Sequence, residues 1–478
     1  MRKLLALLPL LASACAMGPD YKRPDTPPPA VGSFQTTVSG TSTAAPSDRW
    51  WRLYQDPALD RLVERALAAN TDLRAARANL LRAQAVVREA RSGLLPTGDV
   101  SAGANYGNNQ FFGGPQQGGG GGGGQQGGGS NQWSYNGSVS ADWEIDLFGR
   151  IGRTIEAARA DAAAEEAVRD RVALTVAAET ARAYVDACAL SEAITIAKES
   201  AGIAQRELTI QDAREKAGAG SRLDRERAAT VLANVRAALP TLEGRRRASL
   251  FELAALIGAT PSEVPEEAKR CARAPAPVAA IPVGDGRSLL ARRPDVREAE
   301  RRLAADTARI GVATAELYPR ISLGGSGNFF RNDQVRGDDS FTFSLGPLIS
   351  WSWPSLFVGR SRIQQAEAST QASLATFDGA VLTALKEVEQ ALSLYAAEGE
   401  RNQELKDAAT HADAAYRLAE RRYRAGSIAF LELLDTQRDL LDARAALANS
   451  VQQLGSLRVD LFKALGSGWE TAEPASGG

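Results

Sequence analysis

Residues 72–80, DLRAARANL, return in altered form as residues 295–303, DVREAERRL, 223 positions later in the chain. The same spacing relates Pro96 to Pro319, which follow the two helical patterns that contain these repeats. Since proline does not continue a helix, each copy is predicted to change from helix to another structure at that point. The chain therefore contains an internal duplication.

The spacing between the two copies shortens once. Gly149-Arg150 and Gly359-Arg360 are only 210 residues apart. The difference falls on the glycine- and glutamine-rich stretch around residues 111–131, which we interpret as a loop inserted in the first copy. Its most biased part, residues 113–129, is predicted to be a flexible spacer.

Two long proline-free stretches, residues 150–217 and 355–426, occupy equivalent places in the copies. Each can form one helix of roughly 70 residues, about 100 Å long at a rise of about 1.5 Å per residue. Helices of that length need coiled-coil partners. Leucines in the final helix follow a seven-residue period, which predicts a left-handed supercoil rather than an ordinary amphipathic bundle: Leu433, Leu440, Leu447, Leu454 and Leu461.

Residues 133–145 and 341–353 alternate apolar and polar side chains. A period of two predicts strands with one apolar and one polar face. Small hydroxyl side chains dominate the polar faces, and aromatic residues lie near the strand ends of the apolar faces, as in transmembrane barrels. The preceding segments, 100–106 and 321–329, alternate less cleanly but complete a pair of strands in each copy.

Four strands cannot close a barrel, and lipid does not tolerate an open sheet edge. The edges must therefore be closed by neighbouring copies of the chain. Two copies would give eight strands, whose interior is filled by side chains, whereas three give twelve strands and room for a lumen. The sequence thus predicts an oligomer.

Composition excludes several classes of function. A formal net charge of −1 argues against nucleic-acid binding, which needs a surplus of lysine and arginine. The single histidine, His411, is interpreted as a solvated helix residue. Since neither copy contains a nucleophile–base cluster or metal-spaced histidines and cysteines, we expect no metal site, no bound cofactor and no enzyme activity.

The N-terminus has the pattern of a secretory signal peptide, residues 1–14. Its apolar run, residues 4–12, is too short to span a bilayer, which takes about 20 residues. Cys15 follows small residues, as in bacterial lipoproteins, and is predicted to carry diacylglycerol and palmitate. Ala16, in place of an aspartate that retains lipoproteins in the inner membrane, indicates the outer membrane. A plain signal peptide with an incidental cysteine is the alternative.

Cys188 lies in a long helical stretch and Cys271 in a connector rich in proline and alanine. Both are expected in an oxidising compartment. Because two isolated cysteines form no patterned framework, separate thiols are the favoured interpretation and a disulfide is the alternative.

Together these features resemble the TolC-type outer-membrane efflux protein family, in its NodT-like lipoprotein branch, over nearly the whole chain. The resemblance implies a mixed fold and a trimer. Each protomer contributes four strands to a twelve-stranded membrane β-barrel. This barrel continues as an all-α coiled-coil barrel of long periplasmic helices. The matching stretches are CAMGPDYKRP (15–24), WWRLYQDPALDRLVERALAANTDL (50–73), YRAGSIAFLELLD (423–435) and ALGSGW (464–469).

The resulting domain scheme extends the duplication to the whole chain. It begins with the signal peptide 1–14 and a lipidated extended segment 15–50, and it ends with a tail 467–478. Repeat one, 51–258, contains a helix, strands at about 97–110 and 132–147, and long helices at about 150–217 and 221–257. An equatorial linker, 259–286, leads to repeat two, 287–466, which contains a helix, strands at about 320–330 and 340–353, and long helices at about 357–425 and 428–465.

The resemblance further implies a passive exit duct, with an inner-membrane pump of the RND type and a periplasmic adaptor as partners. A duct for type I protein secretion and a non-channel coiled-coil lipoprotein are the alternatives. Adaptor docking is expected at the two helix-to-helix turns, marked by Ala217, Gly218, Ala425 and Gly426.

The family's gate residues can be carried over to matching positions. Glu432 and Asp435, three residues apart on one helix face, correspond to an acidic ring at a narrow entrance. Asp224 and Tyr423 correspond to a hydrogen-bonded pair that closes the gate. Ile428 stands where the family often has an arginine, which leaves the arginine-based closing contact unassigned; Arg222 and Arg227 are the candidate replacements.

Overall fold

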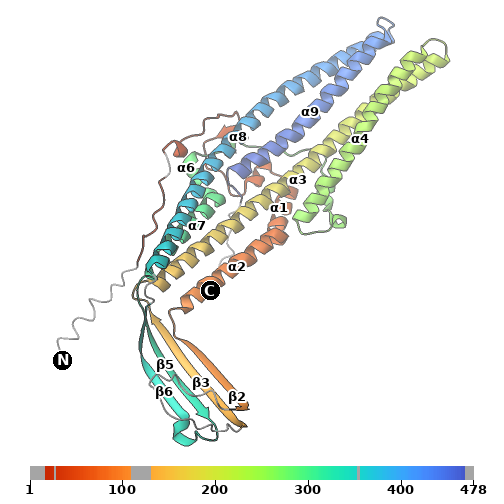
Figure 1. Ribbon diagram of the computed structural model, residues 1–478. Helices are drawn as coiled ribbons and strands as arrows, with labels where there is room; N and C mark the ends of the chain where they lie inside the picture. The colour runs from red at the N-terminus through yellow and green to blue at the C-terminus, as the bar shows by residue number, and fades with distance from the viewer. Residues whose placement is uncertain (1–16, 26–27, 109–130, 352–355, 469–478) are drawn as a thin grey trace. The chain divides into compact units, whose positions relative to one another are not determined.

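The computed structural model describes residues 17–25, 28–108, 131–351 and 356–468. The predicted signal peptide, the lipidation site Cys15 and the loop 113–129 lie outside these residues. Both copies have the same order of elements, namely short helices, two strands, a long helix, a turn and a second helix (Figure 1). The chain divides into two compact units, one with the sheet and one with most of the long helices.

Four antiparallel strands form one sheet, in the order β2-β3-β5-β6 (Figure 1). The two copies meet where β3 pairs with β5, with Val139 opposite Gly327. Within the described residues, β2 and β6 each pair along one edge only. The bounds, close to the predicted ranges, are β2 Thr97–Asn108, β3 Asn131–Ile145, β5 Arg320–Arg331 and β6 Phe341–Ser350.

The alternating pattern produces two chemically different sheet faces. Cross-strand hydroxyl pairs join neighbouring strands, with Ser101 and Ser138 oxygens 2.8 Å apart and Ser326 and Ser344 oxygens 2.9 Å apart. Large apolar side chains remain exposed, among them Phe343 at 90%. Paired small hydroxyls beside exposed aromatics are the arrangement expected of a sheet with one lipid face and one polar face.

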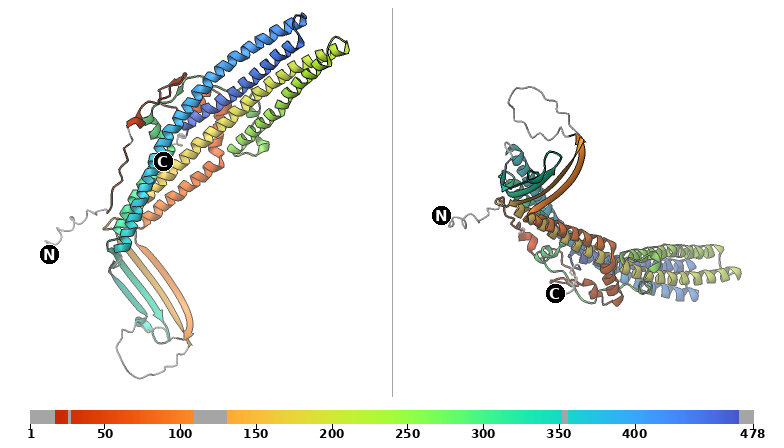
Figure 2. Two further views of the ribbon diagram at one scale, coloured as in Figure 1. Left: turned by 45° about the horizontal axis from the view of Figure 1, so that its top comes forward. Right: turned by 90° about the horizontal axis from the view of Figure 1, so that it is seen from below.

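Two antiparallel hairpins contain the long helices, and they lie side by side (Figures 1 and 2). The first helices of the hairpins contain 67 and 69 residues, roughly 100 Å each at 1.5 Å per residue. Their bounds are α3 Arg150–Lys216, α4 Arg222–Leu256, α8 Leu356–Arg424 and α9 Phe430–Ala464.

The predicted leucine period of α9 faces the protein interior. Leu433, Leu440 and Leu461 are fully buried, Leu454 is buried and Leu447 is half-buried. Burial at one heptad position is what a coiled-coil seam requires. Among the helices of the described residues, none combines the length and the hydropathy that spanning a bilayer requires.

Each copy begins with two consecutive helices where the sequence predicts one. Asn70 interrupts the first copy, because its side-chain oxygen accepts hydrogen bonds from the backbone N–H groups of Asp72 and Leu73 and so starts a new helix. Pro294 starts the corresponding helix in the second copy. The bounds are α1 Pro57–Ala69, α2 Thr71–Ser92, α6 Gly286–Arg292 and α7 Pro294–Ala315.

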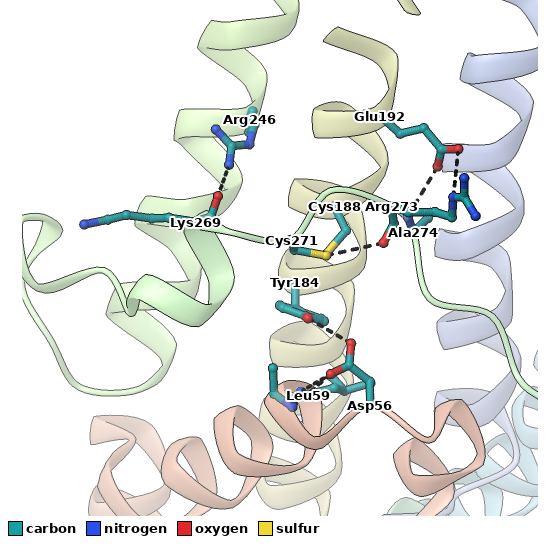
Figure 3. The surroundings of a disulfide bond; sticks show 11 residues. Asp56, Leu59, Tyr184, Cys188, Glu192, Arg246, Lys269, Cys271, Arg273 and Ala274 are labelled. Carbon is teal, nitrogen blue, oxygen red and sulfur yellow. Dashed lines mark hydrogen bonds and ion pairs between the residues drawn. A yellow bond between two sulfur atoms is a disulfide. The ribbon is translucent and has the colours of Figure 1, made fainter. Parts of the chain in front are cut away.

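A disulfide joins Cys188 of α3 to Cys271 in the connector between the copies, with Cα atoms 5.1 Å apart (Figure 3). The favoured expectation of separate thiols is therefore wrong. The connector is held against α3 by further bonds, including one from the Ala274 N–H to Glu192. Arg246 of α4 donates to the Lys269 carbonyl on the other side of the bridge. Because Cys188 and Cys271 are 83 residues apart, only tertiary packing brings them together.

The segment after Cys15 is bound by α3 and α7 within the sheet-containing unit. The buried guanidinium of Arg153 donates to the carbonyls of Met17 and Gly18 and to the Asp20 carboxylate. At Gly311 of α7 a Cβ would lie only 2.7 Å from the Met17 carbonyl oxygen. Glycine at this position therefore permits the close approach of the two backbones.

Replacing both cysteines, Cys188→Ala with Cys271→Ala, should lower the free energy of unfolding by about 2–5 kcal/mol, because the bridge closes a long loop in the unfolded chain. Thermal unfolding of the purified protein with and without reductant measures the effect. Reductant should lower the wild-type midpoint and leave the midpoint of the variant unchanged. A wild-type midpoint that is insensitive to complete reduction would contradict this role.

Candidate functional site

The tip of each helical hairpin, meaning its turn and the adjoining helix ends, contains the predicted functional residues. Gly218 and Gly426 adopt positive φ angles of 68° and 72°. Beyond Gly426, the Ser427 N–H bonds back to the Arg422 carbonyl at 2.9 Å, a glycine-terminated helix end. The predicted docking residues of both turns are exposed, namely Ala217, Gly218, Ala425 and Gly426.

Asp224 is engaged by its own helix. Ser221 caps α4 by accepting from the Asp224 N–H, and the Ser221 hydroxyl donates to the Asp224 carboxylate at 2.8 Å. Arg227, one turn further on, lies 3.6 Å from the same carboxylate. An acid in the first turn of a helix is favourable because of the helix dipole.

Tyr423 of α8 is bound by α3. Its hydroxyl accepts hydrogen bonds from Gln211 at 2.9 Å and from Arg214 at 2.6 Å, and the Arg214 guanidinium lies 5.1 Å from the centre of its ring. The predicted pair of Asp224 and Tyr423 is not formed within the described chain, because each residue is satisfied by a different partner. Tyr423 nevertheless joins the two hairpins.

Arg214, rather than Arg222 or Arg227, supplies the arginine at this tyrosine. The sequence patterns did not identify Gln211 and Arg214 as functional residues, although their spacing of three places them on one face of α3. Ile428 is half-buried and packs with Tyr423 against the apolar cluster between the hairpins. At this position an apolar contact takes the place of a charged one.

Glu432 and Asp435 lie in the first turns of α9, and both are exposed. Asp435 is 60% exposed and forms a long ion pair, 3.8 Å, with Arg438. Leu433 and Leu434 beside them are fully buried. The helix therefore presents these carboxylates to solvent near the tip, while its neighbouring side chains anchor it.

No group of three or more histidine, cysteine, aspartate or glutamate side chains is arranged to hold a metal ion within the described residues. The arrangement at the tips consists of exposed carboxylates, a tyrosine shared between hairpins and exposed turns that contain glycine. Such a site can attract ions and hold two helices together.

A sheet of this kind joined to long paired helices defines the class of the TolC-like outer-membrane channels. The chain matches the family described as outer membrane efflux protein over residues 62–259 and 286–467, and it belongs to that family. It is a protein of the outer membrane, and its relatives are efflux channel proteins rather than enzymes.

Individual relatives agree with this assignment. The pyoverdine export outer membrane protein OpmQ of Pseudomonas putida is 33% identical over 98% of both chains. Nodulation protein T of Rhizobium leguminosarum bv. viciae is 30% identical over 98% of this chain and 94% of its own. The solved outer-membrane channel OprN superposes with a TM-score of 0.85 at 34% identity, covering 96% of this chain and 100% of its own. The predicted NodT-like resemblance and fold class are confirmed.

Tyr423→Phe should raise the single-channel conductance of the protein in planar bilayers. The variant removes the acceptor for Gln211 and Arg214, and leaving a buried amide unsatisfied costs about 1–3 kcal/mol. The effect should be non-additive with Gln211→Ala and additive with Asp224→Ala. If Tyr423→Phe were instead non-additive with Asp224→Ala and additive with Gln211→Ala, the bond between Gln211 and Tyr423 would not be the contact that holds the tip.

Proposed function

We propose that this protein is the passive outer-membrane exit duct of a tripartite efflux pump and works as a homotrimer. The observation that carries the proposal is a four-stranded sheet whose two outer edges have no pairing strand within the described residues, in one chain with two long helical hairpins. A periplasmic adaptor and an inner-membrane pump of the RND type are the proposed partners. Cys15, acylated with diacylglycerol and palmitate, is the proposed anchor in outer-membrane lipid.

Backbone hydrogen bonding supports a closed ring of copies, and the family resemblance implies that the ring contains three. An open edge in hydrocarbon leaves N–H and C=O groups unsatisfied, each at a cost of several kcal/mol. Pairing β6 of one copy with β2 of the next satisfies both edges, and three copies complete twelve strands. Twelve strands leave space for a lumen, whereas eight are filled by side chains.

The helical hairpins provide the proposed periplasmic part of the duct. Their turns are exposed and contain the glycines Gly218 and Gly426, which have positive φ angles, so the turns are accessible to an adaptor. The names of relatives include pyoverdine export and toluene efflux. We therefore propose small molecules as cargo, with selection made by the pump.

Deletion of the gene in its native host should raise the intracellular accumulation of dyes or drugs that the pump exports. Expression of the wild-type chain should restore efflux, and chemical crosslinking of the outer-membrane fraction should give a trimer. Cys15→Ser tests the anchor separately, because it removes acylation and leaves the sheet intact. A monomeric protein that is dispensable for export of every compound tested would overturn the proposal.

In a trimer, Glu432 and Asp435 would place six carboxylates around the periplasmic entrance. Crowded negative charge attracts cations, so the channel should be cation-selective and blocked by multivalent cations. Glu432→Gln with Asp435→Asn should move the reversal potential in a salt gradient toward zero and weaken the block. Asp378 is an exposed acid in the first third of α8, far from the tip. Asp378→Asn is therefore the matched control and should change neither ion selectivity nor block.

A further inference from the structure

A buried carboxylate lies between the hairpins, close to the tyrosine that joins them. Glu207 of α3 is only 5% exposed, although glutamate is rarely buried without a partner. Its Oε1 accepts a hydrogen bond from the Gln211 amide at 2.8 Å. The same amide nitrogen donates to the Tyr423 hydroxyl at 2.9 Å. Glu207 therefore contacts Tyr423 through a single neutral side chain.

This chain of bonds fixes the orientation of Gln211. An amide nitrogen has two hydrogens, and here one is directed to Glu207 and the other to Tyr423. If Gln211 turned by half a rotation, its oxygen would face the Glu207 carboxylate, which cannot donate when ionised. Both forms of Glu207 keep an oxygen that can accept this bond, so the charge on Glu207 changes the cost of burying the carboxylate and not the partner of Tyr423.

The charged groups around Glu207 come from α3 and α8. Glu420 of α8 opposes the charge of Glu207, whereas Arg214 of α3 and Arg424 of α8 favour it. Arg424 is itself bonded to Glu420 at 2.6 Å. Tyr416 of α8 is buried beside both carboxylates, and burial raises the pKa of Tyr416 to about 12, so it stays neutral.

The other two helices contribute apolar side chains to the surrounding cluster. Ala228 and Val231 come from α4, and Phe430 and Leu433 come from α9. These contacts exclude water and offer no charge to balance Glu207. The carboxylate therefore depends on groups of α8 and on its own helix.

We propose that Glu207 and Gln211 are positioning residues for Tyr423, and that the charge on Glu207 controls how firmly α3 and α8 hold together at the tip. This inference rests on the proposed function, because it concerns the opening of the duct. Protonation of Glu207 removes a buried charge and its repulsion by Glu420, and it strengthens the contact. Ionisation weakens the contact and favours a wider tip.

The direction of the pH effect follows from linkage. Burial, aided by Glu420, raises the pKa of Glu207 above its ordinary value of 4.5, against the opposing Gln211 bond and arginines. Separation of α8 from α3 would hydrate Glu207 and return its pKa toward that value. The packed tip therefore binds the proton more tightly, so its added stability is present in acid and is lost as the pH rises above 4.5. For each unit by which the pKa of Glu207 differs between the packed and the open tip, the ratio of packed to open tips changes tenfold across this pH range.

The test is single-channel conductance of the purified full-length trimer in planar bilayers between pH 4.5 and 8. The wild type should conduct increasingly as the pH rises. Glu207→Gln, which keeps the shape and removes the charge, should hold conductance near the acid value of the wild type at all pH values. Glu199→Gln, an exposed acid on the same helix, is the matched control and should behave as the wild type.

The exposed carboxylates Glu432 and Asp435 set ion selectivity in the proposed trimer, so an effect that arises at them should change ion selectivity along with conductance. The response of Glu207 should change conductance with selectivity constant. Glu420→Gln should move the midpoint of that response to lower pH, because the repulsion that favours protonation is gone. This variant keeps the test decisive if Glu207→Gln fails to assemble.

An unchanged pH response in Glu207→Gln, or an unmoved midpoint in Glu420→Gln, would overturn the inference. A wild type that forms no channel at any pH would overturn the proposed duct itself. The two failures are therefore distinguishable.

Discussion

The two outer edges of the sheet, along β2 and β6, have no pairing strand within the described residues, and the rest of the structure depends on this constraint. Backbone N–H and C=O groups need partners, and hydrocarbon offers none. A chain with four such strands is incomplete in a membrane, whatever its side chains. The duplication provides two equivalent hairpins, and their pairing through β3 and β5 brings both copies into one sheet while leaving edges for further copies.

The two copies share an architecture but differ in how they are secured. The first copy is bonded to the connector through Cys188 and Cys271 and through the Ala274 contact. The described part of α8 and α9 contains no comparable covalent link. A duplicated fold can therefore combine one hairpin that is fixed to the connector with one that is held mainly by side-chain packing.

The bonds that join the hairpins at their tips are few and of ordinary strength. Tyr423 receives two hydrogen bonds, each worth about 1 kcal/mol net when both partners are otherwise hydrated. The apolar cluster beside it provides the larger share of the contact, through residues such as Phe430 and Leu433. Polar groups within such a cluster decide which arrangement of the helices is favoured, because a buried polar group that loses its hydrogen-bond partner destabilises the packing.

The sequence by itself determined the duplication, the strand pairs and the bounds of the long helices. These features depend on local properties, namely side-chain period, proline and glycine, so they survive without knowledge of contacts. Asn70 shows the limit, since its capping bond divides a segment whose periodicity predicts one helix. Glu432 and Asp435 are exposed near the tip, and the ring that they would form is a property of the proposed trimer.

Only the tertiary structure decided which residues meet. The rotation of α3 against α8 selects Gln211 and Arg214 as partners of Tyr423, and it buries Glu207. The packing of the connector on α3 likewise brings Cys271 to Cys188. Periodicity identifies which face of a helix is apolar, but it does not fix the rotation and register between helices some two hundred residues apart. Those depend on the packing of the whole cluster at once.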